Sequence, residues 1–180
     1  MKKQLEVRLS GAGGQGLILA GIILAEAALY DEKNAIQSQS YGPEARGGSS
    51  RAEVIISDNE IHYPKVISPN VLVSLTQDSY NKYKGELAED AILIVDETVE
   101  VEADIKHTVY QLPLLEIARV ELRPVVANIV TLGAFQRITG CVSYESLETA
   151  VLDRVPKGTE ELNKQALAAG HKAAGDLLAR

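Results

Sequence analysis

Two glycine-rich segments hold the residues of this chain whose types and spacing could do chemistry. The first is GAGGQG, which stands between an alternating apolar stretch and a long apolar run. Glycine lets backbone N–H groups approach a ligand closely, and the N-terminus of a following helix favours anions. The candidate binding residues in this segment are Gly11, Gly13, Gly14, Gln15 and Gly16.

The glycines of this segment match the dinucleotide fingerprint G-x-G-x-x-G between a predicted strand and a predicted helix. That fingerprint also needs an acidic residue at the end of the second strand, where it holds the ribose hydroxyls. Here the second predicted strand ends at residues 39–41, and Asp31 and Glu32 precede it. The fingerprint is therefore incomplete, and the glycines could equally serve a tight turn packed against the helix.

The second segment, YGPEARGG, combines rigid and permissive backbone around two opposite charges. Arg46 could clamp a phosphate or carboxylate through two hydrogen bonds, and nearby Arg51 could add positive charge. The alternative is a surface turn with a local ion pair between Glu44 and Arg46, which would contribute little. The candidate residues here are Tyr41, Gly42, Glu44, Arg46, Gly47 and Gly48.

The composition is that of one soluble globular domain over residues 1–180, with 46% hydrophobic and 24% charged residues. A formal net charge of -7 leaves no basic field for nucleic acid. The apolar run 17–29 is too short to cross a membrane, and no secretory signal precedes it. The single Cys141 permits no internal disulfide and indicates a reducing, cytoplasmic compartment.

No catalytic residue and no metal ligand are predicted. His62, His107 and His171 lie far apart in the sequence, with no carboxylate or cysteine at metal-ligand spacing. Cys141 has no recognisable histidine partner and is more typical of an incidental thiol than of a nucleophile. One cysteine also cannot ligate an iron–sulfur cluster.

The elements that must position the two glycine-rich segments follow from hydrophobic periodicity and turn signals. Strands are predicted at 4–10, 34–40, 49–57, 71–75, 91–95 and 107–112, with a hairpin turn at Asp58–Asn59 leading into 60–63. Helices are predicted at 17–30, after a Thr76 cap, and at 114–120, 128–139, 143–155 and 159–180, with a stop at Gly140 and starts at Ser143 and Thr159.

The fold expected from this order is α/β. Continuous apolar strands indicate a sheet buried on both faces, and the strand–helix alternation predicts parallel crossovers. The hairpin predicts an antiparallel part. We therefore expect a three-layer α/β/α sandwich with a mixed, mostly parallel sheet and a helical C-terminal section in the same domain.

Three segments together carry a family resemblance: RLSGAGGQG, SQSYGPEARGGSSRAEVIIS and NIVTLGAF. They closely resemble the gamma subunit of 2-oxoacid:ferredoxin oxidoreductases of the pyruvate, 2-oxoglutarate and ketoisovalerate types, and the match covers nearly the whole chain. YGPEARGG is the most specific part, because neither turn chemistry nor dinucleotide binding requires that octamer.

The resemblance implies an α/β/α chain that assembles with alpha and beta subunits and, in some members, a ferredoxin-like delta subunit. Such assemblies convert a 2-oxoacid, coenzyme A and oxidised ferredoxin into acyl-CoA, carbon dioxide and reduced ferredoxin. Thiamine diphosphate and iron–sulfur clusters sit on the partner subunits. The sequence agrees, since it has one cysteine and no GDG-plus-asparagine thiamine diphosphate motif, so the isolated chain should be inactive.

The resemblance further implies that the two glycine-rich segments form one edge of a composite site, near the path by which coenzyme A or the oxoacid reaches it. Two alternatives remain open from the residues alone. One is a free-standing Rossmann-like nucleotide-binding protein, and the other is a non-catalytic assembly partner. The sequence does not choose among pyruvate, 2-oxoglutarate, branched-chain and aryl oxoacids.

Overall fold

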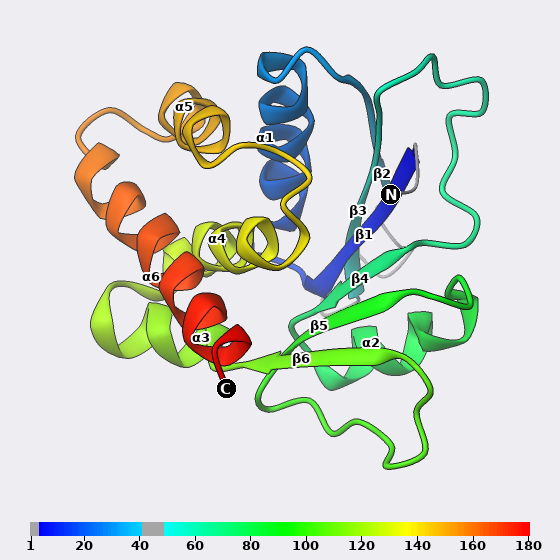
Figure 1. Cartoon of the computed structure of the whole chain (residues 1–180). Helices are drawn as coiled ribbons and strands as arrows, with labels where there is room; N and C mark the ends of the chain where they lie inside the picture. The colour runs from blue at the N-terminus through cyan, green and yellow to red at the C-terminus, as the bar shows by residue number, and fades with distance from the viewer. Residues whose placement is uncertain (1–3, 41–48) are drawn as a thin grey trace.

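The computed structural model describes residues 4–40 and 49–180, and its centre is one six-stranded sheet with the order β2-β3-β1-β4-β5-β6 (Figure 1). The strands are β1 (Gln4–Ala12), β2 (Asn34–Ser40), β3 (Ser49–Ser57), β4 (Val71–Ser74), β5 (Ile92–Asp96) and β6 (Thr108–Leu112).

Strand β1 is central, because β3 pairs with it on one side and β4 on the other. The pairs β1–β4, β4–β5 and β5–β6 are parallel, whereas β1–β3 and β2–β3 are antiparallel. Only β3 runs against the other five strands. The expected mixed, mostly parallel sheet is confirmed.

Helices cover both faces of the sheet. The helices and helical turns are α1 (Leu17–Tyr30), α2 (Gln77–Tyr83), η1 (Lys84–Glu86), α3 (Leu114–Glu116), η2 (Ile117–Glu121), η3 (Pro124–Val126), α4 (Ala127–Thr139), α5 (Tyr144–Arg154) and α6 (Glu160–Leu178). On one face α1 and α4 lie against the sheet, and α5 and α6 pack onto them (Figure 1). The opposite face carries α2 and the loop after β5.

Strand alternation divides the core between these two faces. Val7 and Leu9 of β1 join the larger apolar cluster under α1 and α4. Arg8 and Ser10 alternate with them along the strand, so they face the side of the sheet that α2 covers. Both residues are also buried. A buried charge on a central strand needs partners, and these are described with the candidate site below.

The predicted helix boundaries at Thr76, Gly140 and Ser143 are confirmed. The hydroxyl of Thr76 accepts a hydrogen bond from the backbone of Ser79, and the hydroxyl of Ser143 accepts one from Ser146. Gly140 ends α4 with a φ of 57°. Thr159 begins α6 without a side-chain cap on the helix, because its hydroxyl donates to the carbonyl of Pro156.

The predicted hairpin from Asp58–Asn59 into residues 60–63 is wrong. Residues 60–63 form no strand. The physical reason is that both edges of β3 are already occupied, by β1 and by β2, so no backbone is left for a further partner. The antiparallel part of the sheet comes from β2 and β1 instead.

Helices α4 and α6 cross at two glycines. A Cβ atom added to Gly170 would overlap the carbonyl oxygen of Val130, and one added to Gly133 would overlap the carbonyl oxygen of Leu167. Only glycine allows this approach of the two backbones. In the described part of the chain, no helix has both the length and the apolar character needed to cross a bilayer.

Candidate functional site

The glycine segment lies at the carboxyl end of the central strand. The chain passes from β1 through α1 to β2 on one side of the sheet, and from β4 through α2 to β5 on the other side. The carboxyl ends of β1 and β4 are therefore a topological switch point, which is where open α/β sheets bind ligands. The sequence-predicted location of the site fits this rule.

Gln15 closes the glycine turn from within. The side-chain oxygen of Gln15 accepts a hydrogen bond from the backbone N–H of Ala12 at 2.7 Å. The backbone N–H of Gln15 donates to the backbone carbonyl of Ala12 at 3.3 Å. A Cβ on Gly11 would overlap that same oxygen of Gln15 and crowd Leu17. Gly11 and Gln15 therefore shape the turn rather than face a ligand.

Gly16 also has a packing role. It begins α1 with a φ of 74°, in the left-handed region that favours glycine, and a Cβ there would lie 2.6 Å from the Asn128 amide nitrogen. That amide donates to the Gly16 carbonyl at 3.1 Å. The sequence analysis did not single out Asn128 for the site. The only signal was its place at the start of the NIVTLGAF segment.

Gly13 and Gly14 are the accessible part of the turn. Both are exposed, and a Cβ on either would meet nothing within 4 Å. Gly14 has a φ of 86°, so it needs glycine for its conformation. Of the five predicted residues in this segment, Gly13 and Gly14 are the most exposed, and Gly14 and Gly16 line the cavity described next.

A cavity of about 290 Å³ opens beside the turn. Gly14, Leu19, Ile129, Val155 and Leu162 line it, together with other residues from the starts of α1, α4 and α6. None of these three helices has a side-chain hydrogen bond on its N-cap, and the first turns of α1 and α4 carry no acid. Within the described residues, α1 and α4 thus have no acid in the first turn to compensate the positive end of the helix dipole. This arrangement suits an apolar group with an anionic end.

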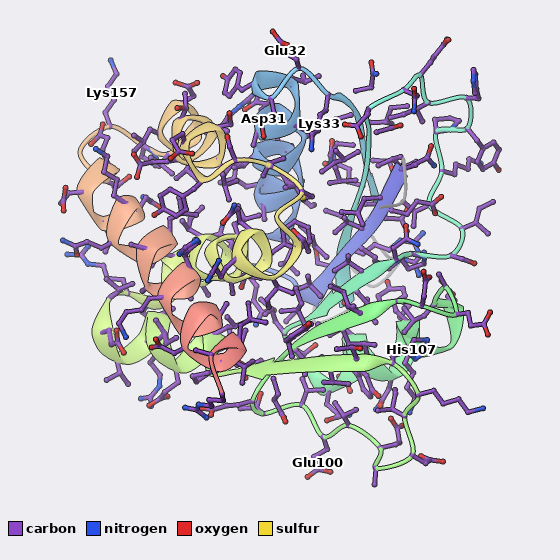
Figure 2. All side chains as sticks on the ribbon, in the orientation of Figure 1. Asp31, Glu32, Lys33, Glu100, His107 and Lys157 are labelled. Carbon is purple, nitrogen blue, oxygen red and sulfur yellow. The ribbon has the colours of Figure 1, made fainter. Side chains whose placement is uncertain are left out.

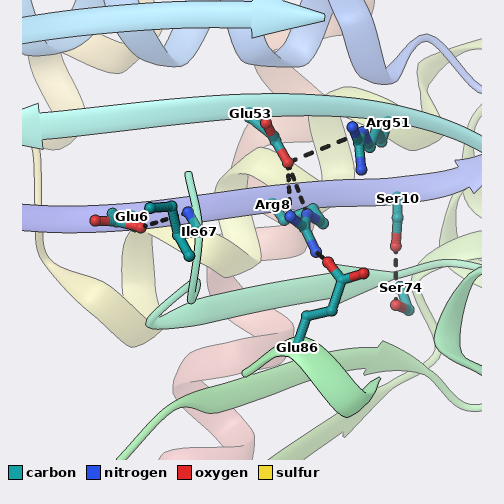
Figure 3. A network of polar contacts seen from close by, with 8 residues as sticks. All are labelled: Glu6, Arg8, Ser10, Arg51, Glu53, Ile67, Ser74 and Glu86. Carbon is teal, nitrogen blue, oxygen red and sulfur yellow. Dashed lines mark hydrogen bonds and ion pairs between the residues drawn. The ribbon is translucent and has the colours of Figure 1, made fainter. Parts of the chain in front are cut away.

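The opposite face of the sheet holds a charged network centred on Arg8, in the middle of β1 (Figure 3). Arg8 is 2% exposed, and its guanidinium donates to Glu53 at 2.8 Å and also to Glu86. The guanidinium lies 5.0 Å from the centre of the Tyr83 ring. Two carboxylates and an aromatic face thus compensate the buried cation.

Arg51 is the less completely paired cation of this network. Its Nε lies 3.9 Å from the Glu53 oxygen that Arg8 already binds, and its guanidinium lies 5.7 Å from the Tyr83 ring centre. Its side chain is partly exposed. Beside it, the hydroxyls of Ser10 and Ser74 lie 3.0 Å apart at the ends of β1 and β4. Arg51, which the sequence suggested as a source of additional positive charge, thus lies near the carboxyl ends of β1 and β4.

The second predicted segment lies outside the described residues, with Tyr41, Gly42, Glu44, Arg46, Gly47 and Gly48. The strand residues on either side of it are described. Ser49 pairs with Ala12, and Ser40 pairs with Arg51. Both flanking residues therefore lie at the edge of the sheet that carries the glycine turn.

Asp31 and Glu32, which precede the second strand and so do not complete the dinucleotide fingerprint, lie far from the glycine turn. Figure 2 shows Asp31, Glu32 and Lys33 grouped where α1 ends, at the opposite end of that helix from Gly16. The Asp31 carboxylate accepts hydrogen bonds from the backbone and hydroxyl of Ser143 and from the Ser146 hydroxyl. These bonds join the end of α1 to the start of α5.

The histidines and the cysteine are also dispersed. His107 bonds the Ala88 carbonyl at 3.1 Å, and His171 packs edge-on against Tyr144. Burial raises the pKa of the Cys141 thiol above its ordinary value, which does not favour a reactive thiolate. Among residues 4–40 and 49–180, no three histidine, cysteine or acidic side chains are placed to share a metal ion.

The fold and the site together define an open α/β domain with a glycine turn at its switch point. Residues 6–173 match the family model described as pyruvate ferredoxin/flavodoxin oxidoreductase. The chain belongs to that family. The resemblance inferred from the sequence motifs is confirmed.

Two curated relatives come from one organism, Methanocaldococcus jannaschii. The chain is 52% identical to 2-oxoglutarate synthase subunit KorC over 182 residues, which cover 98% of this chain and 97% of the relative. It is 32% identical to pyruvate synthase subunit PorC over 166 residues, which cover 90% of this chain and 92% of that relative. Both relatives are subunits of oxidoreductases, as expected from the sequence.

A solved structure shares the fold over nearly the whole length. It is the gamma subunit of a keto/oxoacid ferredoxin oxidoreductase from Geobacter sulfurreducens PCA, with a TM-score of 0.88 and 45% sequence identity. The superposition covers 96% of this chain and 97% of that chain. The expected gamma-type architecture is thus confirmed.

Proposed function

We propose that this chain is the gamma subunit of an oxidoreductase that acts on 2-oxoglutarate. In the assembly, 2-oxoglutarate, coenzyme A and oxidised ferredoxin would yield succinyl-CoA, carbon dioxide and reduced ferredoxin. The observation that carries the choice of oxoacid is the higher identity to the 2-oxoglutarate synthase subunit than to the pyruvate synthase subunit of the same organism.

The contribution of this chain is to position anionic groups of the substrates at the edge of a shared site. The exposed backbone of Gly13 and Gly14, the two uncompensated helix ends and the partly paired Arg51 all support this role. In the sequence, YGPEARGG with Arg46 stands between Ser40 and Ser49, whose described positions are at the same edge. Coenzyme A, with its phosphates and its long uncharged arm, is the co-substrate that this chemistry suits.

The residues of this chain do not fit the redox cofactor of such an enzyme. An iron–sulfur cluster needs several thiolates, and the chain has one cysteine. We therefore assign the clusters, and thiamine diphosphate with them, to the alpha, beta and ferredoxin-like delta subunits. Electrons would leave through those partners to ferredoxin, in the cytoplasm.

The test is to purify the assembly that forms around the full-length chain. A brown complex that reduces a dye when 2-oxoglutarate and coenzyme A are both present is expected, with at least tenfold lower kcat/KM for pyruvate. A preference for pyruvate would overturn the substrate assignment, and a colourless chain without partners would overturn the gamma-subunit role.

The site assignment is tested by Arg46→Ala in the assembled enzyme. Loss of one bidentate contact to an anionic group costs about 1.5–3 kcal/mol, so the apparent KM for coenzyme A or 2-oxoglutarate should rise by roughly tenfold or more. Arg180→Ala, at the exposed C-terminus, is the matched control. Unchanged kinetics would remove Arg46 from the site, and a failure to assemble would assign it to an interface.

A further inference from the structure

The guanidinium of Arg51 has donors that the described protein does not use. A guanidinium carries several N–H donors, and in the described part of the chain that of Arg51 makes no hydrogen bond. Its ion pair there places Nε 3.9 Å from a carboxylate oxygen of Glu53. The side chain is 31% exposed, so a ligand can reach it. Arg51 is therefore able to bind a further anion.

Backbone and side-chain contacts hold this guanidinium in place. Arg51 lies in the β1–β3 ladder, where it pairs with Ser10. Its guanidinium lies 5.7 Å from the centre of the Tyr83 ring, and that tyrosine is 3% exposed at the end of α2. A guanidinium that is already held loses less conformational entropy when an anion binds. Arg51 thus suits selective binding better than a loose surface cation does.

Arg8 keeps Glu53 from neutralising Arg51 (Figure 3). The Nε atom of Arg8 donates to a Glu53 oxygen at 2.8 Å, and a terminal nitrogen of Arg8 also lies 2.8 Å from that oxygen. Arg8 is 2% exposed, and a buried cation that loses its carboxylate is strongly unfavourable. Glu53 is therefore committed to Arg8, and its longer separation from Arg51 leaves the second guanidinium open.

Positive charge exceeds negative charge around the Tyr83 ring. Three cations lie 5.0–5.7 Å from the ring centre, and they are Arg8, Arg51 and Lys82. Among residues 4–40 and 49–180, two carboxylates pair with these cations, and they are Glu53 and Glu86. The whole chain, by contrast, has a formal net charge of -7. A local excess of positive charge attracts anions, so the neighbours of Arg51 also favour an anion there.

We propose that Arg51 binds the second carboxylate of the oxoacid, which is the group that distinguishes 2-oxoglutarate from pyruvate. The planar fork of a guanidinium matches a carboxylate through two parallel N–H···O bonds. An oxoacid that ends in a methyl group would leave these donors unpaired, and sites of this kind reject such analogues strongly. The inference rests on the proposed function and names the residue of this chain that selects the oxoacid.

The place of Arg51 favours the oxoacid over coenzyme A. The apolar cavity beside the glycine turn lies among α1, α4 and α6, on one face of the sheet. Arg51 lies on the other face, where α2 brings Tyr83 to it. Beside it are the buried hydroxyls of Ser10 and Ser74. The cavity suits the long uncharged arm of coenzyme A, whereas one guanidinium beside buried hydroxyls suits a single small carboxylate.

The experiment compares 2-oxoglutarate with 2-oxopentanoate in the assembled enzyme, because these substrates differ only in a terminal carboxylate or methyl group. Arg51→Met should lower kcat/KM for 2-oxoglutarate at least about tenfold more than kcat/KM for 2-oxopentanoate. The KM for coenzyme A should stay within about twofold of the wild type. Arg119→Met is the matched control, since this exposed arginine pairs with Glu116 elsewhere in the fold. It should not change the preference between the two oxoacids.

Arg51→Lys is a second variant, for the case that Arg51→Met does not assemble. It keeps the charge but loses the planar fork, so it should assemble and lose an intermediate part of the preference for 2-oxoglutarate. Failure of both variants to assemble would give Arg51 a structural role and overturn the inference.

The kinetic outcomes separate this inference from the proposed function. Equal losses with the two oxoacids would overturn the inference. A raised KM for coenzyme A with unchanged oxoacid kinetics would assign Arg51 to a phosphate, and would overturn the inference while the proposed function stands. A wild-type enzyme without preference for 2-oxoglutarate over pyruvate would overturn the proposed substrate itself.

Discussion

The side-chain oxygen of Gln15 accepts the backbone N–H of Ala12 at 2.7 Å and so holds the glycine turn closed from the inside. Gln15→Leu should remove this bond and leave the N–H without its partner, at a cost of about 1–2 kcal/mol in unfolding free energy. In the assembled enzyme the apparent KM for coenzyme A should rise, because the turn loses its shape. Urea unfolding and steady-state kinetics measure the two effects.

Gln15→Glu is the control for that prediction, since the carboxylate keeps an acceptor at the same place. It should behave much more like the wild type than the leucine variant does. Equal damage by both variants would show that Gln15 acts through its amide nitrogen or through a partner, and not through the bond to Ala12.

Truncation of Arg8 should lower the unfolding free energy strongly, because it leaves a buried carboxylate without its cation. Arg8→Ala leaves Glu53 without its closest cation and should lower the unfolding free energy by about 3–5 kcal/mol. Arg51→Ala should cost less than about 1 kcal/mol, because that pair is 3.9 Å apart and partly exposed. The double variant Arg8→Met with Glu53→Leu should recover much of the loss. Urea unfolding of the wild type and of the three variants measures these differences.

The crossing of α4 and α6 predicts an asymmetry between two glycines. Gly170→Ala forces a methyl group onto the Val130 carbonyl, so the helices must separate, at a cost of about 3 kcal/mol or more. Gly85→Ala meets no atom within 4 Å and should change stability by less than about 0.5 kcal/mol. Thermal unfolding of the two variants gives the comparison. Similar midpoints would contradict the close approach.

Asp31 should make the junction of α1 and α5 sensitive to acid. Burial alone would raise the pKa of this carboxyl group, but hydrogen bonds from Ser146 and Ser143 outweigh burial and lower it. A lowered folded-state pKa gives stability that is present above the unfolded value of about 3.9 and is lost as pH falls through the folded value.

The stability gap between wild type and Asp31→Asn should therefore narrow as the pH falls below about 4. Urea unfolding of the two proteins between pH 6 and about 3 measures it. A gap that stays constant over this range would show that the ionised form of Asp31 has no special stabilisation.

The local elements were predictable where the pattern was strong. The apolar run of α1, the strands β2 and β3, and the caps at Thr76 and Ser143 all follow from periodicity and side-chain chemistry that act within a few residues. The pairing of β3 was not predictable from its turn signal. Asp58–Asn59 suits a hairpin, but occupation of both β3 edges depends on residues about 15 and 45 positions away.

The sequence correctly placed the glycine turn between a strand and a helix, but it did not show the packing roles of the residues in the turn. The sequence grouped the five residues of the glycine turn as binding residues, whereas Gly11, Gln15 and Gly16 are committed to packing. That distinction depends on Asn128, which is 112 residues from Gly16 in the sequence. The partners of the buried Arg8 were hidden for the same reason, since Glu53 and Glu86 meet it only after the sheet, α2 and η1 have formed.

The apolar character of α1 also has a consequence for synthesis on the ribosome. This helix is made early, but the elements that cover it are β3, α4 and α5, which end at residues 57, 139 and 154. At a synthesis rate of about 5–20 residues per second, the core-facing side of α1 remains exposed to solvent for several seconds. The nascent chain therefore exposes an apolar helix until β3, α4 and α5 have been made.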